Sequence, residues 1–326
     1  MPNYVIKALK KLEHPVPNKP QHSPHRWIHK TYGQKVHYAP SDDTSDLLSP
    51  KETTHIQRIV GSFLYYARAI DNTTHVAIND LGTTQAKPTK KTNDQAVMLM
   101  DYLFTHPDAK IRYHASGMQL YIDSDAAYLV APQAKSRIAG YFYLSDKYTQ
   151  GSGNPHPQFN GPIHIECQLL KHVVSSAAEA ETSAIFLNCK TAIWIKHMLE
   201  ALGHQQKIIP LKTDNSTADS FSNSTLKERK SKAWDMRLYW IKDRVTGKEF
   251  YIYWSAGANN FADYFTKHFS PSYHQQIRPT YILKNHNVSS TEHPREGVLI
   301  YQDITPWGSP DTSPGSSVTH DQNIHL

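Results

Sequence analysis

The stretch Met-Gln-Leu-Tyr-Ile-Asp-Ser-Asp, residues 118–125, alternates apolar and polar side chains at the two-residue period of a β-strand. Leu120 and Ile122 share one side of this predicted strand, and Asp123 lies on the other side, where the apolar pattern ends. An acidic residue at a strand end often serves only to form a turn. Asp123 becomes a candidate for chemistry because three further acidic residues lie at the starts of elements downstream.

Four more strands and four helices are predicted after this strand. Two-residue alternation or unbroken apolar runs predict the strands, at residues 138–144, 163–169, 207–213 and 250–254. Helices are predicted at residues 176–202, 215–223, 232–245 and 260–269, the last ended by Pro271. Turns or loops join the first three strands, which implies an antiparallel meander. The order indicates an α/β fold, a five-stranded mixed sheet with flanking helices.

The segments on either side of this region differ in pattern. Apolar residues at three- and four-residue spacing predict three short helices, near residues 53–67, 76–81 and 93–105. Residues 12–50 are rich in Pro, His and Ser, and residues beyond about 283 are rich in Ser, Thr, Pro and Gly. The predicted organisation is an extended tether at 1–50, a small helical segment at 51–111, an α/β domain at 112–270 and a mostly disordered tail at 271–326.

The 326-residue chain carries 35 Lys and Arg against 29 Asp and Glu, which gives a formal net charge of +6. This excess favours a polyanionic partner, although a modest positive charge is ordinary in soluble proteins. The two cysteines, Cys167 and Cys189, form neither a disulfide framework nor a metal-binding pattern, so we expect a reducing compartment. No apolar run approaches the roughly 18 residues of a membrane span, and residues 1–11 lack the pattern of a signal peptide. We therefore expect an intracellular protein that is not secreted and has no membrane partner.

Four acidic residues lie at the joints between predicted elements: Asp123, Glu181, Asp214 and Asp263. Asp214 can instead cap the helix that follows it, and Asp263 can complement a helix N-terminus. Carboxylates without cysteine or clustered histidine suit a hard cation held by oxygen, hence Mg²⁺ or Mn²⁺. Two such ions about 4 Å apart can activate a water and stabilise the leaving oxygen of a phosphodiester. The spacing of these four acidic residues in the sequence does not by itself decide between accidental helix caps and a two-ion site.

Two glutamates compete for a role at the start of the long predicted helix. Ser176 and Glu179 fit a capping box, in which the Glu179 carboxylate reaches back to the free amide of Ser176. Glu181 lies about 200° further round the helix, on the inward side with Ala184 and Ile185. A carboxylate that faces the sheet needs a partner to offset its desolvation, and a cation is the obvious one. The sequence therefore predicts a structural role for Glu179 and a metal-binding role for Glu181.

Several motifs, in the correct order, resemble the ribonuclease H domain of copia-type retrotransposon polyproteins. They are Tyr-Ile-Asp-Ser-Asp (121–125), Ser-Arg-Ile-Ala-Gly-Tyr-Phe (136–142), Ser-Ser-Ala-Ala-Glu-Ala-Glu (175–181), Thr-Asp-Asn-Ser-Thr-Ala (213–218) and Ala-Asp-Tyr-Phe-Thr-Lys (262–267). Residues 236–245 also resemble the family's helix before the fifth strand, and residues 59–66 resemble the segment that links the reverse transcriptase to this domain. The resemblance extends from about residue 47 to residue 270.

This resemblance implies a ribonuclease H-like fold and hydrolysis of the RNA strand in RNA–DNA hybrids. By motif position, it implies that Asp123, Glu181, Asp214 and Asp263 are the catalytic residues and the ligands of Mg²⁺ or Mn²⁺. It also implies the polymerase portion of the reverse transcriptase polyprotein as a partner, and a location in a cytoplasmic virus-like particle or in the nucleus. One departure from related nucleases is that the loop at 257–260 lacks the histidine that often precedes the last acid.

Nucleic-acid contacts are predicted near the acidic residues. A basic run supplies candidate phosphate contacts, at Lys227, Arg229, Lys230 and Lys232, although a solvated charged loop is the alternative. Ser124 and Asn215 are candidates for sensing the 2′-hydroxyls that distinguish a hybrid from duplex DNA. Two other functions stay open: a non-catalytic or domesticated nucleic-acid-binding module, and a DNA nuclease or transposase on the same fold.

Overall fold

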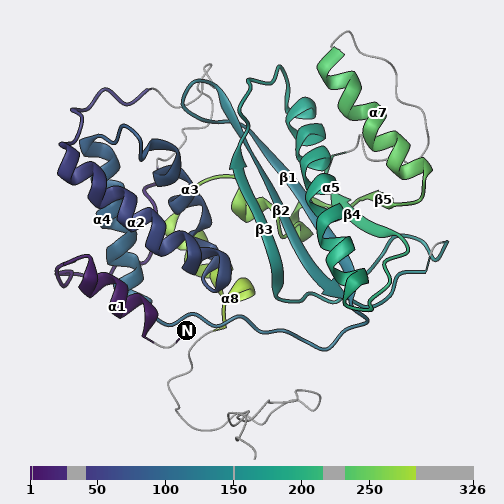
Figure 1. Ribbon diagram of the computed structural model, residues 1–326, viewed down its shortest axis with the longest axis horizontal. Coiled ribbons are helices and arrows are strands. Elements are labelled where there is room, and N and C mark those ends of the chain that lie inside the picture. The colour runs from purple at the N-terminus through teal and green to yellow at the C-terminus, as the bar shows by residue number, and fades with distance from the viewer. Residues whose placement is uncertain (2, 28–41, 150, 216–231, 284–326) are drawn as a thin grey trace, which may run out of the picture. The chain divides into compact units, whose positions relative to one another are not determined.

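The computed structural model describes residues 1, 3–27, 42–149, 151–215 and 232–283, with residues 232–235 described by their backbone alone (Figure 1). At its centre is a five-stranded mixed sheet in the order β3-β2-β1-β4-β5. The strands are β1 (Gln119–Ala131), β2 (Lys135–Ser145), β3 (Pro162–Leu169), β4 (Ile209–Thr213) and β5 (Phe250–Trp254). Strands β1, β2 and β3 are antiparallel neighbours, whereas β4 runs parallel to both β1 and β5. The predicted meander and the predicted mixed sheet are both confirmed.

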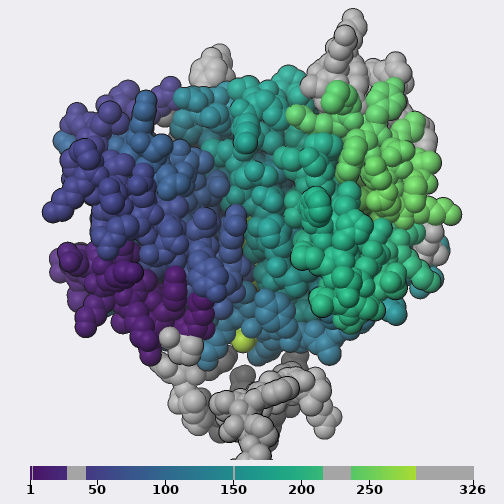
Figure 2. Space-filling view, in the orientation of Figure 1, coloured from purple at the N-terminus to yellow at the C-terminus, as the bar shows by residue number. Residues whose placement is uncertain are grey.

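One face of the sheet is covered by helix α5 (Ala177–Ala201), and helix α7 (Lys232–Thr246) packs beside α5 (Figure 1). Leu120 and Ile122 of β1 face this layer and pack in one apolar cluster with Ile185 and Cys189 of α5. Figure 2 shows the atoms of α5 and α7 at the surface on this side of the molecule. The apolar side of the strand predicted at 118–125 is therefore the side that binds α5.

The opposite face of the sheet is aromatic. Tyr141 of β2 is fully buried there, with its ring near those of Phe261, Phe265 and Tyr281. Two short 3₁₀ helices, η2 (Gly257–Asn259) and η3 (Asp263–Phe265), and the α-helix α8 (Pro271–Tyr281) supply these neighbours or lie next to them. The segment after β5 thus crosses the sheet on the side opposite α5.

This C-terminal segment corrects two predictions. Residues 260–269 do not form the predicted α-helix and contain only the short 3₁₀ helix η3. Pro271 begins a helix where one was predicted to end and a disordered tail to begin. Proline suits the first position of a helix because its fixed φ is already helical and its missing N–H has no helical partner there. Ser270 caps α8 by accepting a hydrogen bond from the backbone N–H of Tyr273, at 3.2 Å.

Among the described residues before the sheet are four helices and a 3₁₀ turn: α1 (Tyr4–Lys11), α2 (Pro50–Ala69), η1 (Asn72–Thr74), α3 (His75–Thr84) and α4 (Lys90–Thr105). The three helices predicted between residues 53 and 105 are confirmed. Helix α1 lies where an extended tether was predicted. Val5 and Leu9, four residues apart on α1, are buried, which explains why this segment is helical.

A single apolar cluster joins these helices to the aromatic face of the sheet. It includes Ile59 and Phe63 of α2 together with Tyr141 and Tyr143 of β2. The predicted boundary between residues 111 and 112 therefore falls inside a shared core, and independent folding of 112–270 stays a prediction. No helix in the described ranges is long and apolar enough to cross a membrane.

Candidate metal centre

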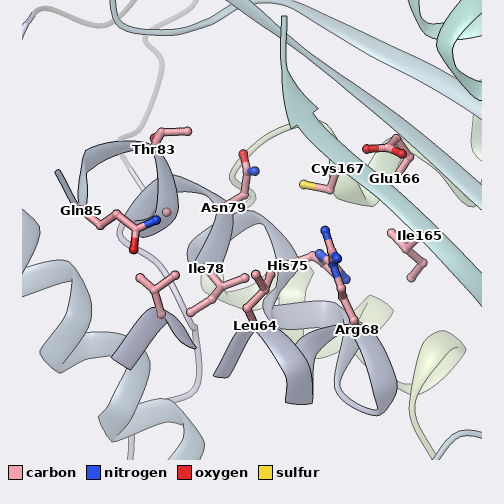
Figure 3. A pocket seen from close by; sticks show the side chains of 12 residues that line it. Leu64, Arg68, His75, Ile78, Asn79, Thr83, Gln85, Ile165, Glu166 and Cys167 are labelled. Atoms are coloured by element: carbon pink, nitrogen blue, oxygen red, sulfur yellow. The ribbon is translucent and has the colours of Figure 1, made fainter. Parts of the chain in front are cut away.

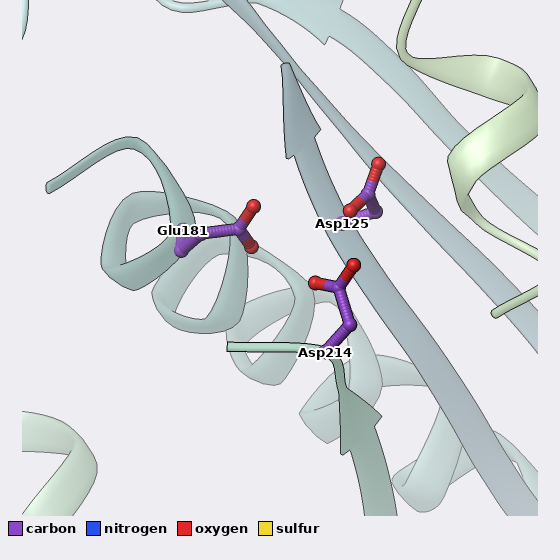
Figure 4. A group of neighbouring side chains, drawn as sticks. All are labelled: Asp125, Glu181 and Asp214. Atoms are coloured by element: carbon purple, nitrogen blue, oxygen red, sulfur yellow. The ribbon is translucent and has the colours of Figure 1, made fainter. Parts of the chain in front are cut away.

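The register between β1 and β4 brings Asp125, rather than Asp123, beside Asp214. Asp123 lies opposite Lys212 in this parallel pair of strands. Two residues further along each strand are Asp125 and Asp214, so these two side chains meet at the end of β4. Glu181 reaches the same point from the second turn of α5, and Figure 4 shows the three carboxylates pointing toward one another.

The three carboxylates form a compact cluster. One oxygen of each of Asp125, Glu181 and Asp214 lies within 4.8 Å of the corresponding oxygens of the other two. Glu181 Oε1 accepts a hydrogen bond from the backbone N–H of Ala126 at 3.2 Å. Glu181 Oε2 is buried and has no hydrogen-bond partner among the described residues. A buried, unsatisfied carboxylate oxygen is costly, and this one faces two further carboxylates.

Burial and the charges of neighbouring carboxylates raise the pKa of each acid in this cluster. Burial is the largest cause for Asp125, and the charges of Asp263 and Asp214 add to it, which raises the pKa of Asp125 to about 7. Burial, then the charges of Asp125 and Asp214, raise the pKa of Glu181 well above its ordinary value. Burial also raises the pKa of Asp214. Each raised pKa shows that the ionised form of the carboxyl group is disfavoured at this site. A bound cation would instead favour the ionised form.

Asp263 lies at the edge of this cluster. Its charge raises the pKa of Asp125, but it is not one of the three residues whose carboxylate oxygens lie within 4.8 Å of one another. Lys267, four residues later, contacts the Asp263 carboxylate at 2.7 Å, and both side chains are partly exposed. Asp263 is therefore near enough to influence the cluster but is paired with a lysine.

Asp123 does not share the environment that the sequence analysis predicted for it. Its side chain is fully buried, and Asp123 Oδ2 forms an ion pair with Lys212 Nζ at 2.7 Å. No carboxylate cluster in the described residues includes it. We correct the assignment because the β1–β4 register places Asp123 one pair deeper in the sheet, opposite a lysine, and leaves Asp125 to meet Glu181 and Asp214.

The predicted nucleic-acid contacts have different outcomes. Ser124 is fully buried and its Oγ accepts a hydrogen bond from Asn188 Nδ2 at 2.9 Å, so its predicted contact with nucleic acid is wrong. The strand alternation turns Ser124 toward α5, away from the side that carries Asp123 and Asp125. Asn215, directly after Asp214, is partly exposed. The predicted helix at 215–223 beyond Asn215, and the candidates Lys227, Arg229 and Lys230, lie outside the described residues, as does the side chain of Lys232.

Glu179 has the structural environment predicted for it, with one difference in its partner. Ser176 Oγ accepts a hydrogen bond from the backbone N–H of Glu179 at 3.2 Å, which makes Ser176 the N-cap of α5. The Glu179 carboxylate accepts hydrogen bonds from the backbone N–H and the hydroxyl of Ser175, both at 2.8 Å, instead of from the amide of Ser176. Glu179 therefore fixes the chain that enters the helix, and Glu181 is left to face the cluster.

A separate cavity of about 270 Å³ lies between α2, α3 and β3 (Figure 3). Its lining includes Arg68, His75 and Cys167, and its single carboxylate is that of Glu166. Burial lowers the pKa of His75 to about 3, so this imidazole is neutral at physiological pH. The cavity lacks the grouped oxygen ligands of the carboxylate cluster and is a different kind of site.

The sequence of this chain is similar to transposon polyproteins of Saccharomyces cerevisiae. It is 24% identical over 243 residues to the transposon Ty1-DR1 Gag-Pol polyprotein, a match that covers 72% of this chain and 13% of that protein. The Ty1-NL2 Gag-Pol polyprotein is 24% identical over 224 residues, a match that covers 67% of this chain and 12% of that protein. The chain is homologous to Ty1 Gag-Pol polyproteins. The predicted resemblance to copia-type polyproteins is confirmed, and the chain spans about an eighth of the length of these relatives.

No family model matches the chain. Similar solved structures include the N-terminal ribonuclease H domain of rv2228c from Mycobacterium tuberculosis, with a TM-score of 0.31 and 9% identity over 50% of this chain and 97% of that one. They also include the foamy viral protease-reverse transcriptase in complex with RNA/DNA hybrid, with a TM-score of 0.40 and 11% identity. This match covers 79% of this chain and 28% of that one. Both TM-scores are below 0.5, so the fold of this chain is described by its own five-stranded mixed sheet, in the order β3-β2-β1-β4-β5, with flanking helices.

Proposed function

We propose that this chain is a metal-dependent endoribonuclease that cleaves the RNA strand of RNA–DNA hybrids. The proposal rests on the cluster of Asp125, Glu181 and Asp214, whose three carboxylates converge. One buried oxygen of this cluster, Glu181 Oε2, lacks a hydrogen-bond partner among the described residues. Homology to Ty1 Gag-Pol polyproteins supports the same activity, because reverse transcription of an RNA element produces such hybrids.

The residues present fit a divalent cation of the hard class. All three are oxygen donors, which suits Mg²⁺ or Mn²⁺ better than softer metals. The raised pKa values of Asp125 and Glu181 mean that a positive charge placed among them would be stabilising. When bound, such a cation would act as a Lewis acid that lowers the pKa of a water and offsets charge on the phosphodiester. We propose two ions, with Asp263 at the edge of the cluster as a further ligand.

The residues of this chain would orient the substrate around that cluster. Lys267, half-exposed and paired with Asp263, presents a cation beside the carboxylates, where it can approach a phosphate. Asn215 follows Asp214 directly and can reach a 2′-hydroxyl of the RNA strand. We further propose that Lys227, Arg229, Lys230 and Lys232 contact phosphates, which would supply affinity with little preference for sequence.

The polyprotein context is part of the proposal. Because the chain matches about an eighth of the length of its relatives, we propose that it works together with a polymerase portion of a reverse transcriptase. A cytoplasmic particle or the nucleus would then be its place of action. Helices α2 to α4, which share a core with the sheet, are the segment through which the two would connect, and residues 59–66 of α2 resemble the segment that links a reverse transcriptase to this domain.

The test incubates the full chain with labelled RNA–DNA hybrid, duplex RNA and duplex DNA, each with Mg²⁺, with Mn²⁺ and with EDTA. We expect cleavage of the RNA strand of the hybrid alone, and only with metal. Equal cleavage of duplex DNA would favour a DNA nuclease or transposase. Binding of the hybrid without cleavage in either metal would favour a non-catalytic module, and undiminished cleavage in EDTA would contradict the metal assignment.

A further inference from the structure

The Asp123–Lys212 ion pair is the most deeply buried charged pair next to the carboxylate cluster. Asp123 is 0% exposed and Lys212 is 7% exposed, and their charged atoms are 2.7 Å apart. Burying both charges is expensive, and an apolar pair of similar size would often stabilise a protein as well or better. The pair therefore calls for an explanation other than stability of the sheet.

Both partners of this pair also bind the loop that follows β5. Lys212 Nζ donates a hydrogen bond to the backbone carbonyl of Asn259 at 2.5 Å, and its ammonium lies 4.9 Å from the centre of the Phe261 ring. Asp123 Oδ2 accepts a hydrogen bond from the backbone N–H of Phe261 at 2.9 Å. Asp123 Oδ2 and Lys212 Nζ thus contact both each other and the loop, whereas Asp123 Oδ1 is buried and has no hydrogen-bond partner among the described residues.

The residue between these two contacts is attached to β1 as well. Asn260 is buried, and its Nδ2 donates to the backbone carbonyl of Ser124 at 2.9 Å, while its Oδ1 accepts from the N–H of Ala262 at 3.0 Å. Three consecutive loop residues, 259 to 261, therefore contact the segment of β1 and β4 directly before Asp125 and Asp214.

Each end of this loop lies near the carboxylate cluster. A Cβ added at Gly257 would lie 2.8 Å from Asp214 Oδ2, so the loop backbone approaches this carboxylate closely enough to exclude a side chain. At the other end, Asp263 follows Phe261 by two residues, and its charge raises the pKa of Asp125. The position of the loop thus decides both the space around Asp214 and the distance of Asp263 from the cluster.

We propose that Asp123 and Lys212 are positioning residues, which hold the loop 257–263 so that Asp263 and Gly257 lie against the metal centre. This inference rests on the proposed function for its catalytic consequence, but the attachment of the loop is independent of any activity. Asp123 acts through the loop and does not contact the metal.

The decisive variant is the double substitution Asp123→Leu/Lys212→Met, which replaces the ion pair by two apolar side chains of similar length. If the pair only stabilised the core, this variant would behave like the wild type. We expect instead that hydrogen exchange of the amides at 257–263 accelerates at least about tenfold relative to the rest of the sheet, measured without metal. We also expect kcat on the hybrid to fall about 10–100-fold with an unchanged KM, the loss typical of a misplaced catalytic group.

Two further variants keep the test decisive. Asn260→Ala removes the bond to β1 without touching the ion pair and should also accelerate exchange of the loop. Leu199→Ala, at the far end of α5 from Glu181, destabilises the core as a control and should leave exchange of the loop unchanged relative to the sheet. Wild-type exchange of the loop in both the double variant and Asn260→Ala would overturn the inference, as would an equal loss of kcat in Leu199→Ala.

The exchange measurement separates this inference from the proposed function. If the wild type cleaves no hybrid, the proposed function fails, whereas faster exchange at 257–263 would still establish the attachment. If the wild type cleaves and the double variant keeps wild-type kcat, the positioning role fails while the proposed function stands. Loss of Mn²⁺ binding in the double variant, at the level seen for Asp125→Asn, would show that Asp123 is a ligand and overturn the inference.

Discussion

Asp123 and Asp125 lie two residues apart on β1, on the same side of the strand, and both are almost completely buried. Their neighbours differ. Asp123 lies opposite Lys212, which neutralises it, whereas Asp125 lies among the carboxylates of Asp214, Glu181 and Asp263. Two identical side chains on one strand thus face opposite charges.

The neighbouring charges shift the pKa values of the two aspartates in opposite directions. Burial raises the pKa of Asp123, and the charge of Lys212 lowers it again, with help from a hydrogen bond with the Phe261 amide. Burial also raises the pKa of Asp125, but there the nearest charges raise it further. A divalent cation would therefore be repelled by Lys212 at the first position and attracted at the second. The charge of the neighbour, more than the residue type, decides which aspartate can bind metal.

The largest effect is expected when the charge of a cluster residue is removed. Asp125→Asn and Asp214→Asn should each lower hybrid cleavage by about 10²–10³-fold or more, because each removes a charge that the reaction needs in a buried site. Binding of the hybrid should persist, since phosphate contacts supply most of the affinity. Cleavage rates at saturating Mg²⁺ and binding in EDTA give the two readouts.

The control for this prediction is Glu166→Gln, which removes a partly buried carboxylate on β3 that lies in the separate cavity. It should leave cleavage unchanged. Near-normal turnover in Asp125→Asn, together with a complete loss in Asp123→Asn that also abolishes Mn²⁺ binding, would return the metal centre to Asp123.

Most of the fold could be predicted from the sequence because it depends on local patterns. The five strands and the helices α2 to α5 and α7 follow from periodicity of two or of three to four residues, and Gly203 has the positive φ, 92°, expected where α5 stops. The segment after β5 was harder. Its backbone is fixed by contacts with Asp123, Lys212 and Ser124, which are distant in sequence and leave no periodic signal.

The candidate metal centre can be predicted only in part, for the same reason. Glu181 and Asp214 stand out because each follows a strong local signal, a capped helix start and a strand end. Choosing between Asp123 and Asp125 requires the register of β1 against β4, which is a long-range property. The sequence Asp-Ser-Asp offers both aspartates on one side, and only the pairing of residue 123 with residue 212 shows which of them reaches Asp214.

Two glutamates near the start of α5 are expected to respond oppositely to the loss of their charge. Glu181→Gln should greatly reduce Mg²⁺-dependent cleavage, and it should raise the melting temperature of the metal-free protein by relieving repulsion with Asp125. Glu179→Gln should lower stability by about 0.5–2 kcal/mol, the range for helix caps, with little effect on cleavage. Melting temperature without metal and turnover with Mg²⁺ are measured for both variants. The opposite pattern, in which Glu179→Gln abolishes cleavage, would show that the helix faces the sheet differently.

The smallest expected effect is a dependence of metal-free stability on pH. In the unfolded chain Asp125 has an ordinary carboxyl pKa, near 3.8, whereas in the folded protein its pKa is raised to about 7. Between these values the folded state holds a proton that the unfolded state has released, so stability is fully present at low pH and is lost as pH rises through about 7. The metal-free protein should therefore lose stability between about pH 4 and about pH 7, as measured by urea unfolding in EDTA. Asp125→Asn should make this loss smaller, because its amide does not ionise, and saturating Mg²⁺ should remove it in the wild type by favouring the ionised carboxylates.

Asp123 adds a dependence of the same sign, since its pKa is also raised, and Asp123→Asn is the matched comparison. The contradicting outcome is that Mg²⁺ binds Asp125→Asn with the affinity of the wild type and suppresses its pH dependence as fully as in the wild type and in Asp123→Asn. Asp125 would then not hold the metal, and the contrast between the two aspartates would fail.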